Sequence, residues 1–206
     1  MSIREVIQGS TAIPVLTITE VSVGVELCRA LHAGGLKVLE VTLRTPQALD
    51  AVSAVAKALP DAIVGVGTLT RPEEFQRSRD AGARFAVSPG LTHRLAIAAT
   101  ESRLPYLPSA ITPSEVMAAR EWGFSTLKFF PCKAAGGGAA LKNLAPVFPD
   151  VAFCPTGGLT AEDFRDYLAL ANVVCVGGTW MMPAKLVDAR DWKGIEAIAR
   201  ATVAPG

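Results

Sequence analysis

The sequence is poor in the residues that most often build metal sites and strongly charged surfaces. It has only two histidines among 206 residues, and its four cysteines form no C-x-x-C pair. Two isolated histidines without an H-x-H or H-E-x-x-H spacing argue against a zinc site. Charged residues make up only 19% of the chain, and the formal net charge is +1. The composition therefore excludes a strongly basic surface of the kind that binds nucleic acid.

Long apolar runs are also missing. No run approaches the roughly 18 residues that a membrane-spanning helix needs. The opening segment contains Glu5 and no long apolar core, so we expect neither a secretory signal nor a membrane association. Half of the residues are hydrophobic, which suits a sizeable core and not a disordered chain. We therefore expect a cytoplasmic protein whose residues 1–206 form one domain.

The chain does contain a regular alternation of short apolar, β-branched runs and helical segments. The runs are mostly apolar on both faces, as strands inside a parallel sheet should be. They are Ala12–Ile18, Val38–Leu43, Ala62–Leu69, Phe85–Ser88, Pro105–Ile111, Thr126–Phe130, Val151–Pro155 and Asn172–Val176. Eight strand–helix repeats predict an α/β fold, a compact (β/α)₈ TIM barrel, with Ser2–Gln8 as a short N-terminal helix at its bottom. An open doubly wound sheet is the alternative, although no G-x-G-x-x-G precedes the first helix.

Threonines mark the expected helix starts, and glycines mark the ends. A threonine there can accept hydrogen bonds from the free N–H groups of the first turn. A proline that follows it costs no hydrogen bond, because the N–H at the first helical position has no partner within the helix. The threonines are Thr45, Thr70, Thr92, Thr112 and Thr160, and prolines follow the first and fourth of them. Helices are then expected to end near Gly34, Gly82 and Gly123.

Lys128 is the most unusual residue, because it lies in the core of a predicted strand. Burying an ammonium costs several kcal/mol unless it is paired or neutral. A desolvated lysine has a lowered pKa, and its neutral amine can attack a carbonyl to form a Schiff base. The alternative is a buried lysine–glutamate pair that only stabilises the interior. In a barrel, the active site lies at the C-terminal ends of the strands, where Lys128 would be.

Glu40, Thr42 and Arg44 alternate along the second strand, so they share one face. A glutamate beside a lysine can move protons during catalysis. Arg44 has the fork geometry that binds a carboxylate or phosphate, and a salt bridge to a neighbouring loop is its alternative role.

Two glycine-rich loops follow the last two predicted strands. They are Gly157-Gly158 and Gly177-Gly178-Thr179. Backbone N–H groups exposed at such loops bind phosphate, and barrels commonly place phosphate after strands seven and eight. The pattern therefore predicts a phosphate site there. The glycine tract at residues 136–138 is weaker evidence, since it fits a flexible loop.

Six motifs in these strands and loops, taken together and in order, resemble one enzyme family. The motifs are VLEVTLRT (38–45), GVGT (65–68), SPG (88–90), LKFFP (127–131), FCPTGG (153–158) and VGGTW (176–180). The sequence resembles the 2-keto-3-deoxy-6-phosphogluconate (KDPG) aldolase and 4-hydroxy-2-oxoglutarate (KHG) aldolase family over nearly the whole chain.

The resemblance implies a metal-free class I aldolase without a cofactor, on a TIM barrel that assembles as a homotrimer. It implies cleavage of KDPG to pyruvate and glyceraldehyde 3-phosphate in the Entner–Doudoroff pathway. It also implies cleavage of KHG to pyruvate and glyoxylate. The expected partner is thus a small phosphorylated keto acid.

The resemblance also implies roles for individual residues. By position, Lys128 is similar to the Schiff-base lysine and Glu40 to the general acid/base. The pyruvate-side pocket is expected at Arg44, Thr68 and Pro89, with Phe130 as its wall and Thr156 at the substrate hydroxyl. The phosphate contacts are expected at Gly157, Gly158, Gly178 and Thr179.

The sequence departs from the family pattern at three places. Family members often carry Gly-Ile-Ser-Thr where this chain has Ser109-Ala-Ile-Thr112, and Pro-Ala-Glu where it has Pro131-Cys132-Lys133. Thr179 stands in place of a common serine. The chemistry at Lys128 is untouched, but the far end of the substrate stays open. The alternatives are a 2-keto-3-deoxy-6-phosphogalactonate aldolase, another phosphate-binding barrel enzyme such as an isomerase, or a binding protein without turnover.

Overall fold

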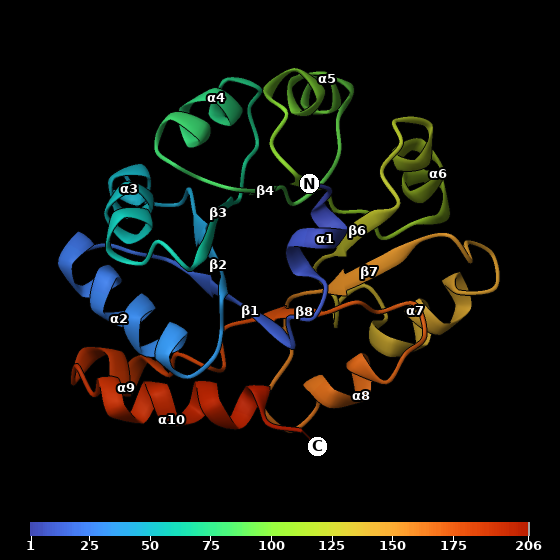
Figure 1. The fold of residues 1–206 in the computed structure, drawn as a ribbon. Helices are drawn as coiled ribbons and strands as arrows, with labels where there is room; N and C mark the ends of the chain where they lie inside the picture. The colour runs from blue at the N-terminus through green and yellow to red at the C-terminus, as the bar shows by residue number, and fades with distance from the viewer. Residues whose placement is uncertain (206) are drawn as a thin grey trace.

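The computed structural model describes residues 1–205, and it arranges helices around a ring of parallel strands (Figure 1). Six strands form a parallel sheet curved as half of a barrel, in the order β5-β4-β3-β2-β1-β8, and β6 pairs with β7 separately. The strands are β1 (Ala12–Leu16), β2 (Val38–Thr42), β3 (Ile63–Gly67), β4 (Ala86–Val87), β5 (Tyr106–Leu107), β6 (Thr126–Phe129), β7 (Ala152–Pro155) and β8 (Val176–Gly178). The doubly wound alternative is wrong, because β8 lies beside β1 and the order from β1 to β5 follows the chain.

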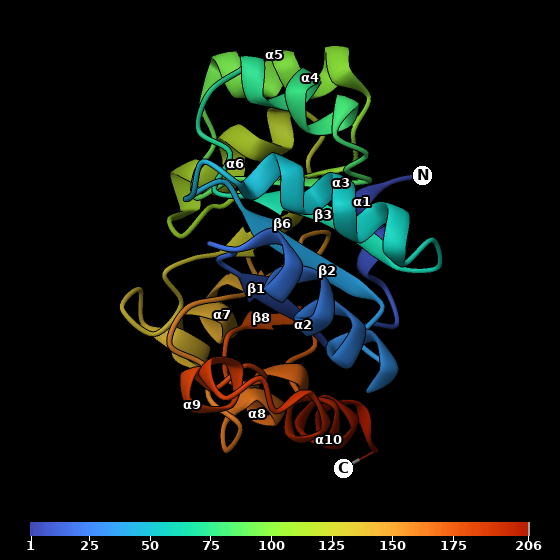
Figure 2. The same ribbon diagram turned by 90° about the vertical axis from the view of Figure 1, so that its left-hand side faces the viewer.

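Isolated bridges connect the two sheets on both sides. Ser109, just after β5, forms a parallel bridge with Lys128 of β6, and Thr156, just after β7, forms one with Gly177 of β8. Parallel neighbours need a crossover connection, which here carries helices on the outside of the strands (Figure 2). The carboxyl ends of the strands therefore meet at one side of the molecule.

The last strand differs from its prediction. Each predicted run except the eighth contains the strand observed there, but the eighth strand is Val176–Gly178 and not Asn172–Val176. Val176 pairs with Ala12 of β1, and the two glycines after it continue this register, whereas Val173 forms only a bridge to β7. Pairing with β1, and not β-propensity, decides where this strand lies.

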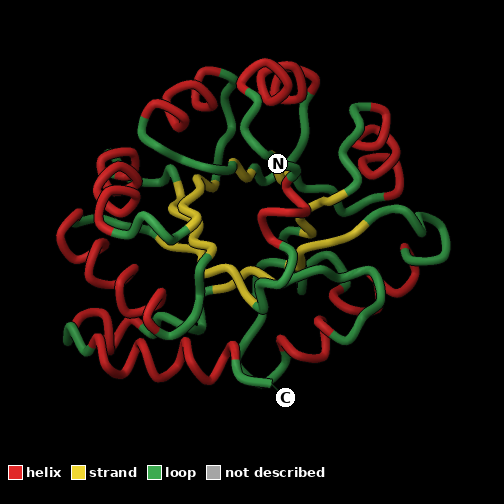
Figure 3. Tube along the Cα trace, in the orientation of Figure 1, coloured by secondary structure: helices red, strands yellow, loops and turns green. Residues whose placement is uncertain are grey.

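The helices form the outer layer, apart from the first one (Figure 3). None of the helices within residues 1–205 is long and apolar enough to cross a membrane. Two helices follow β8, where the prediction had one. The helices are α1 (Ile3–Ile7), α2 (Val21–Ala33), α3 (Ala48–Ala58), α4 (Glu73–Asp80), α5 (His93–Ser102), α6 (Pro113–Glu121), α7 (Gly137–Leu144), α8 (Phe164–Leu168), α9 (Ala184–Asp188) and α10 (Trp192–Val203).

The predicted threonine caps are confirmed at two helices. The Thr92 hydroxyl accepts a hydrogen bond from the N–H of Leu95 at the start of α5. Thr112 and Glu115 form a full capping box at α6, whose first residue is Pro113 as expected.

The other three threonine caps are wrong. Helix α3 begins three residues after Thr45, whose hydroxyl donates instead to a carbonyl of the β1–α2 loop at 2.6 Å. At Thr70 and Thr160 the direction is reversed, because their backbone N–H groups donate to the carboxylates of Glu74 and Asp163. Acidic side chains thus organise two loops where we expected threonine hydroxyls.

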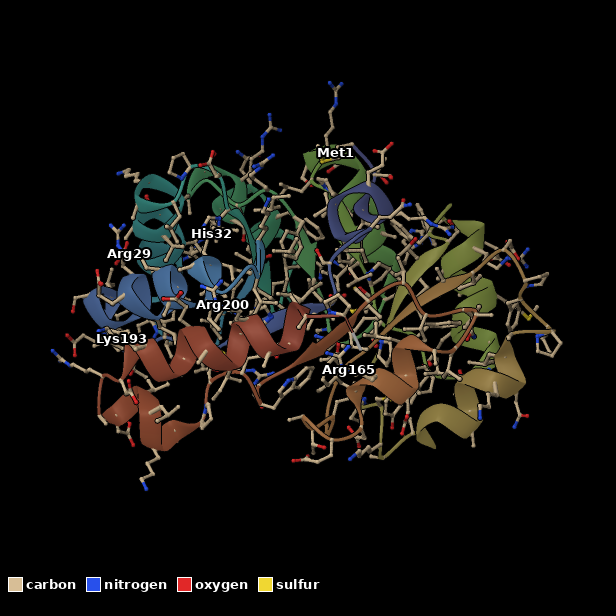
Figure 4. The ribbon with its side chains drawn as sticks, turned by 60° about the horizontal axis from the view of Figure 1, so that its bottom comes forward. Met1, Arg29, His32, Arg165, Lys193 and Arg200 are labelled. Atoms are coloured by element: carbon tan, nitrogen blue, oxygen red, sulfur yellow. The ribbon has the colours of Figure 1, made fainter. Side chains whose placement is uncertain are left out.

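The last helix packs against the first large one. A Cβ at Gly34, after α2, would overlap Ala199 of α10, so this glycine allows the two helices to approach closely. On the other side, Arg165 of α8 donates to the carbonyls of Ala201 at 3.3 Å and Ala204 at 2.8 Å (Figure 4). These contacts hold α10 between α2 and α8.

The first helix, α1, closes the ring at the end where the strands begin. A capping box between Ser2 and Glu5 starts it, and the predicted N-terminal helix is confirmed. Figures 1 and 3 show α1 over the interior of the ring. Its apolar side chains belong to a buried cluster with inward-facing strand residues, made of Ile3, Val6, Ile7, Ile13, Val38, Phe85, Val87, Leu107, Cys154 and Cys175.

We expect Ile7→Ala to lower the free energy of unfolding by about 2–5 kcal/mol, because Ile7 is fully buried in this cluster and its loss leaves a cavity. Urea unfolding followed by circular dichroism measures the change. The matched control is Gln8→Ala, at an exposed neighbour, which should stay within about 0.5 kcal/mol of the parent. Equal stability of both variants would show that α1 does not contribute to the core.

Candidate active site

Lys128 of β6 and Glu40 of β2 meet inside the ring of strands. Lys128 Nζ lies 3.4 Å from Glu40 Oε1, and the two side chains are only 7% and 4% exposed. The ammonium also lies 5.1 Å from the centroid of the Phe130 ring. Either charge alone would be costly here, so each stabilises the other. The structure thus brings together the two residues that the sequence marked as unusual.

Gly67 of β3 makes room for the Glu40 carboxylate. It pairs with Thr42, two residues along β2 from Glu40. A Cβ at Gly67 would overlap the carboxylate, and one at Gly65 would overlap the ring of Phe85. Sequence reasoning gave Gly67 no role. Its signal was the G-x-G pattern in a strand, which often marks close approach by another group.

Arg44 reaches from the end of β2 to the end of β3. Its Nε donates a hydrogen bond to Thr68 Oγ1 at 3.0 Å. Thr68 has a φ of +60°, a left-handed conformation that is strained for a β-branched residue and is often found at functional sites. No salt bridge joins Arg44 to another residue in the range 1–205. The rest of its guanidinium fork is free to bind a small anion.

Three predicted pocket residues follow the carboxyl ends of strands and differ in their exposure to solvent: Phe130, Thr156 and Pro89. A Cβ at Gly157 would lie 3.1 Å from the Phe130 ring, so this ring packs under the loop after β7. Thr156 is buried, and its hydroxyl donates to the carbonyl of Cys154 at 3.4 Å. Pro89 is exposed just after β4, and it takes part in neither the packing of the Phe130 ring nor the hydrogen bond of Thr156.

The two glycine loops lie side by side, because Thr156 pairs with Gly177. Gly157 and Gly158 have φ angles of +101° and +86°, which few other residues adopt. A Cβ at Gly178 would overlap the Trp180 ring, which stacks on Phe164 of α8. The backbone N–H groups of three residues, Gly157, Gly158 and Thr179, donate to no group that the structure describes. They are available to an anion.

Two buried thiols, those of Cys154 and Cys175, lie beside the Lys128–Glu40 pair. Cys154 is in register with Lys128, and its Sγ lies 3.4 Å from that of Cys175. The hydrogen bond that Cys175 donates to Cys154, together with burial, raises the pKa of Cys175 well above its usual value. The thiol therefore stays neutral and adds no charge beside the pair. No group of three or more histidine, cysteine, aspartate or glutamate side chains within residues 1–205 is placed to hold a metal ion.

Sequence reasoning also missed Asp163. Only the threonine at position 160 was expected to cap helix α8, but the Asp163 carboxylate forms an ion pair with Lys133 in the loop after β6. The departure at Lys133 was visible in the sequence. Its partner was not, because the two residues are brought together only by the fold.

A family model described as "Aldolase: KDPG and KHG aldolase" matches residues 3–198. The chain belongs to the KDPG and KHG aldolase family. The resemblance that the six motifs indicated is therefore confirmed.

Relatives from this aldolase family match the chain over almost its whole length. The KHG/KDPG aldolase of Escherichia coli K12 is 45% identical over 202 residues, which are 98% of this chain and 95% of the relative. A KDPG aldolase from Legionella pneumophila, solved with pyruvate captured at low pH as a covalent carbinolamine, is 42% identical, covers 98% of both chains and has a TM-score of 0.95. That of Zymomonas mobilis ZM4, solved with 3-phosphoglycerate, is 40% identical with a TM-score of 0.93 and covers 98% of this chain and 95% of its own.

We expect Lys128→Met to destabilise the fold by about 3 kcal/mol, because it leaves the Glu40 carboxylate buried without a partner. The double variant Lys128→Met/Glu40→Gln should recover most of this loss. Urea unfolding of the parent, both single variants and the double variant gives the coupling between the two residues. If Lys128→Met is as stable as the double variant, then Lys128 does not compensate the buried charge of Glu40.

Proposed function

We propose that this chain is a class I aldolase that cleaves KDPG to pyruvate and glyceraldehyde 3-phosphate, and KHG to pyruvate and glyoxylate. The observation that carries the proposal is the buried Lys128 amine 3.4 Å from the Glu40 carboxylate. Anion-binding groups flank this pair, with Arg44 on one side and the free N–H groups of the glycine loops on the other. The names of the E. coli and Legionella relatives support the same assignment.

Lys128 provides the nucleophile. As its proton passes to Glu40, the amine attacks the C2 ketone, and the resulting carbinolamine takes this proton back as it loses water to give an iminium. The iminium withdraws electrons from the C3–C4 bond, so the reaction needs no metal or other cofactor as electron sink. The Legionella relative holds pyruvate as a carbinolamine, which is the corresponding intermediate for the pyruvate half of the substrate.

Glu40 moves the protons. It takes the proton of the C4 hydroxyl, directly or through a water molecule, as the C3–C4 bond breaks and its electrons pass into an enamine. Glyceraldehyde 3-phosphate leaves at this point. Glu40 then returns a proton to C3, and hydrolysis of the iminium releases pyruvate and the free amine of Lys128.

The remaining pocket residues orient the substrate. In our proposal Arg44, Thr68 and Pro89 form the pyruvate-side pocket, with the free part of the Arg44 fork on the carboxylate. Phe130 forms the wall beside the Lys128 amine. Thr156, which lies at the end of β7, contacts the substrate hydroxyl.

The phosphate end of the substrate is assigned to the two glycine loops. Gly157, Gly158, Gly178 and Thr179 provide backbone N–H groups and one hydroxyl. Fixed backbone donors suit a phosphate because they carry partial positive charge without the flexibility of a side chain. The Zymomonas relative, whose structure contains 3-phosphoglycerate, supports a phosphate-bearing ligand in this family.

We further propose that the two sheets form one closed (β/α)₈ TIM barrel in a single domain over residues 1–206, of which Gly206 lies outside the described residues. The bridges of Ser109 with Lys128 and of Thr156 with Gly177 support closure. From the family resemblance we infer a cytoplasmic homotrimer that acts in the Entner–Doudoroff pathway.

Trapping with borohydride tests the Schiff base. Incubation with pyruvate and borohydride should add a reduced pyruvyl group to Lys128, which mass spectrometry of the digested protein locates. Lys128→Met should give no adduct and no cleavage of KDPG, because the amine that forms the iminium is gone. No adduct on the well-folded parent, or substantial cleavage by the variant, would refute the mechanism.

We expect Gly67→Ala to lower kcat for KDPG by roughly 10²–10⁴, the range for losing a general acid/base, because the new Cβ displaces the Glu40 carboxylate. The adduct on Lys128 should still form. Gly138→Ala is the control, since the nearest atoms to its Cβ would be 3.9 Å away. If both variants keep the parent kcat, Gly67 does not position Glu40.

A further inference from the structure

Lys133 and Asp163 form an ion pair at the open end of the ring, which we call the rim pair. Lys133 Nζ lies 2.5 Å from Asp163 Oδ2, and the two side chains are 44% and 28% exposed. Lys133 belongs to the loop after β6, and Asp163 directly precedes α8. The rim pair thus connects the loops that follow two neighbouring strands.

Both members of the rim pair are held against the first glycine loop. The backbone N–H of Lys133 donates to the carbonyl of Gly157 at 3.2 Å. A Cβ at Gly158 would lie 3.1 Å from three carbon atoms of the Lys133 side chain, so the stem packs on this residue. Asp163 Oδ1 accepts the N–H of Thr160 at 2.7 Å. The two charges are therefore fixed close to the free N–H groups of the loop.

The carboxylate of the rim pair is ionised. Partial burial acts against ionisation, but the hydrogen bonds from Lys133 and from the Thr160 N–H outweigh it, and the pKa of Asp163 is lowered. The neighbouring Glu162 is exposed, and the hydroxyl of Thr160 lowers the pKa of this carboxyl too. Glu162 and Asp163 therefore place two negative charges near the first glycine loop. The ammonium of Lys133 compensates the charge of Asp163.

We propose that the rim pair sets the affinity of the site for the phosphate end of the substrate. Lys133 cancels the charge that Asp163 would otherwise present to a phosphate dianion at the glycine loops, where like charges a few ångströms apart repel strongly. The inference rests on the proposed function and deepens it. The rim pair takes no part in bond cleavage, because Lys128 and Glu40 lie inside the ring.

Two charge-neutralising variants test the rim pair without changing its packing. Lys133→Met keeps the stem on Gly158, and Asp163→Asn keeps the acceptor oxygen for the Thr160 N–H. Lys133→Met should raise KM for KDPG about tenfold, with kcat and the KM for the unphosphorylated KHG changing by less than about threefold. Asp163→Asn should lower KM for KDPG by about threefold.

The double variant distinguishes charge from structure. If Lys133 acts by cancelling the Asp163 charge, then Lys133→Met/Asp163→Asn should bring KM for KDPG back to within about threefold of the parent. A purely structural role predicts no rescue. Lys142→Met, in the last turn of α7, makes the same change in net charge away from the loop and should leave both KM values unchanged.

A titration with inorganic phosphate, followed by calorimetry, gives the same ranking independently of turnover. Lys133→Met should weaken phosphate binding and Asp163→Asn should strengthen it. Unchanged phosphate affinity and an unchanged ratio of the two KM values in Lys133→Met would overturn the inference, as would no rescue in the double variant. A parent that cleaves neither substrate would refute the proposed function alone, and the phosphate titration would then decide on the rim pair.

Discussion

The interior of the ring holds one ammonium and one carboxylate, and the surrounding structure keeps both of them out of water and close together. Among the described residues, Lys128 and Glu40 are the buried charged side chains. Gly67 leaves space for the carboxylate, and the Cys175 thiol nearby stays protonated because it donates a hydrogen bond to Cys154 and is buried. A pair with few other polar partners and little solvent suits a reaction in which the amine must be free to leave its carboxylate and attack a carbonyl.

The chemical centre of this site could be predicted from the sequence, whereas its supporting contacts could not. Lys128 and Glu40 stand out because a charged residue in an apolar strand must be paired or functional, and this is visible without coordinates. Gly67 matters only through its register with β2, which places it against Glu40. The role of Asp163 is not visible in its local sequence, because its contact with Lys133 depends on how two distant loops fold together.

The fold shows the same division between local and long-range information. The alternation of strands and helices predicted the element order, and short apolar runs located the strands. The eighth strand was placed too early, because its residues Gly177 and Gly178 are poor strand formers that pair with β1 only in the assembled sheet. Capping at Thr112 followed from a local pattern and is confirmed, while the Thr160 N–H donates to Asp163 in the loop before α8, a helix without a side-chain cap.

Helix α1 determines from which end of the ring the site can be reached. Because its side chains fill the ring at the end where the strands begin, reactants and products share one passage, at the opposite end. Under the proposed mechanism, the phosphorylated aldehyde lies nearer this passage and the covalently held three-carbon fragment lies deeper. The aldehyde therefore leaves first, and pyruvate follows once its bond to Lys128 is hydrolysed. In the synthetic direction, pyruvate has to bind before the aldehyde, so the structure favours ordered release in cleavage and ordered binding in synthesis.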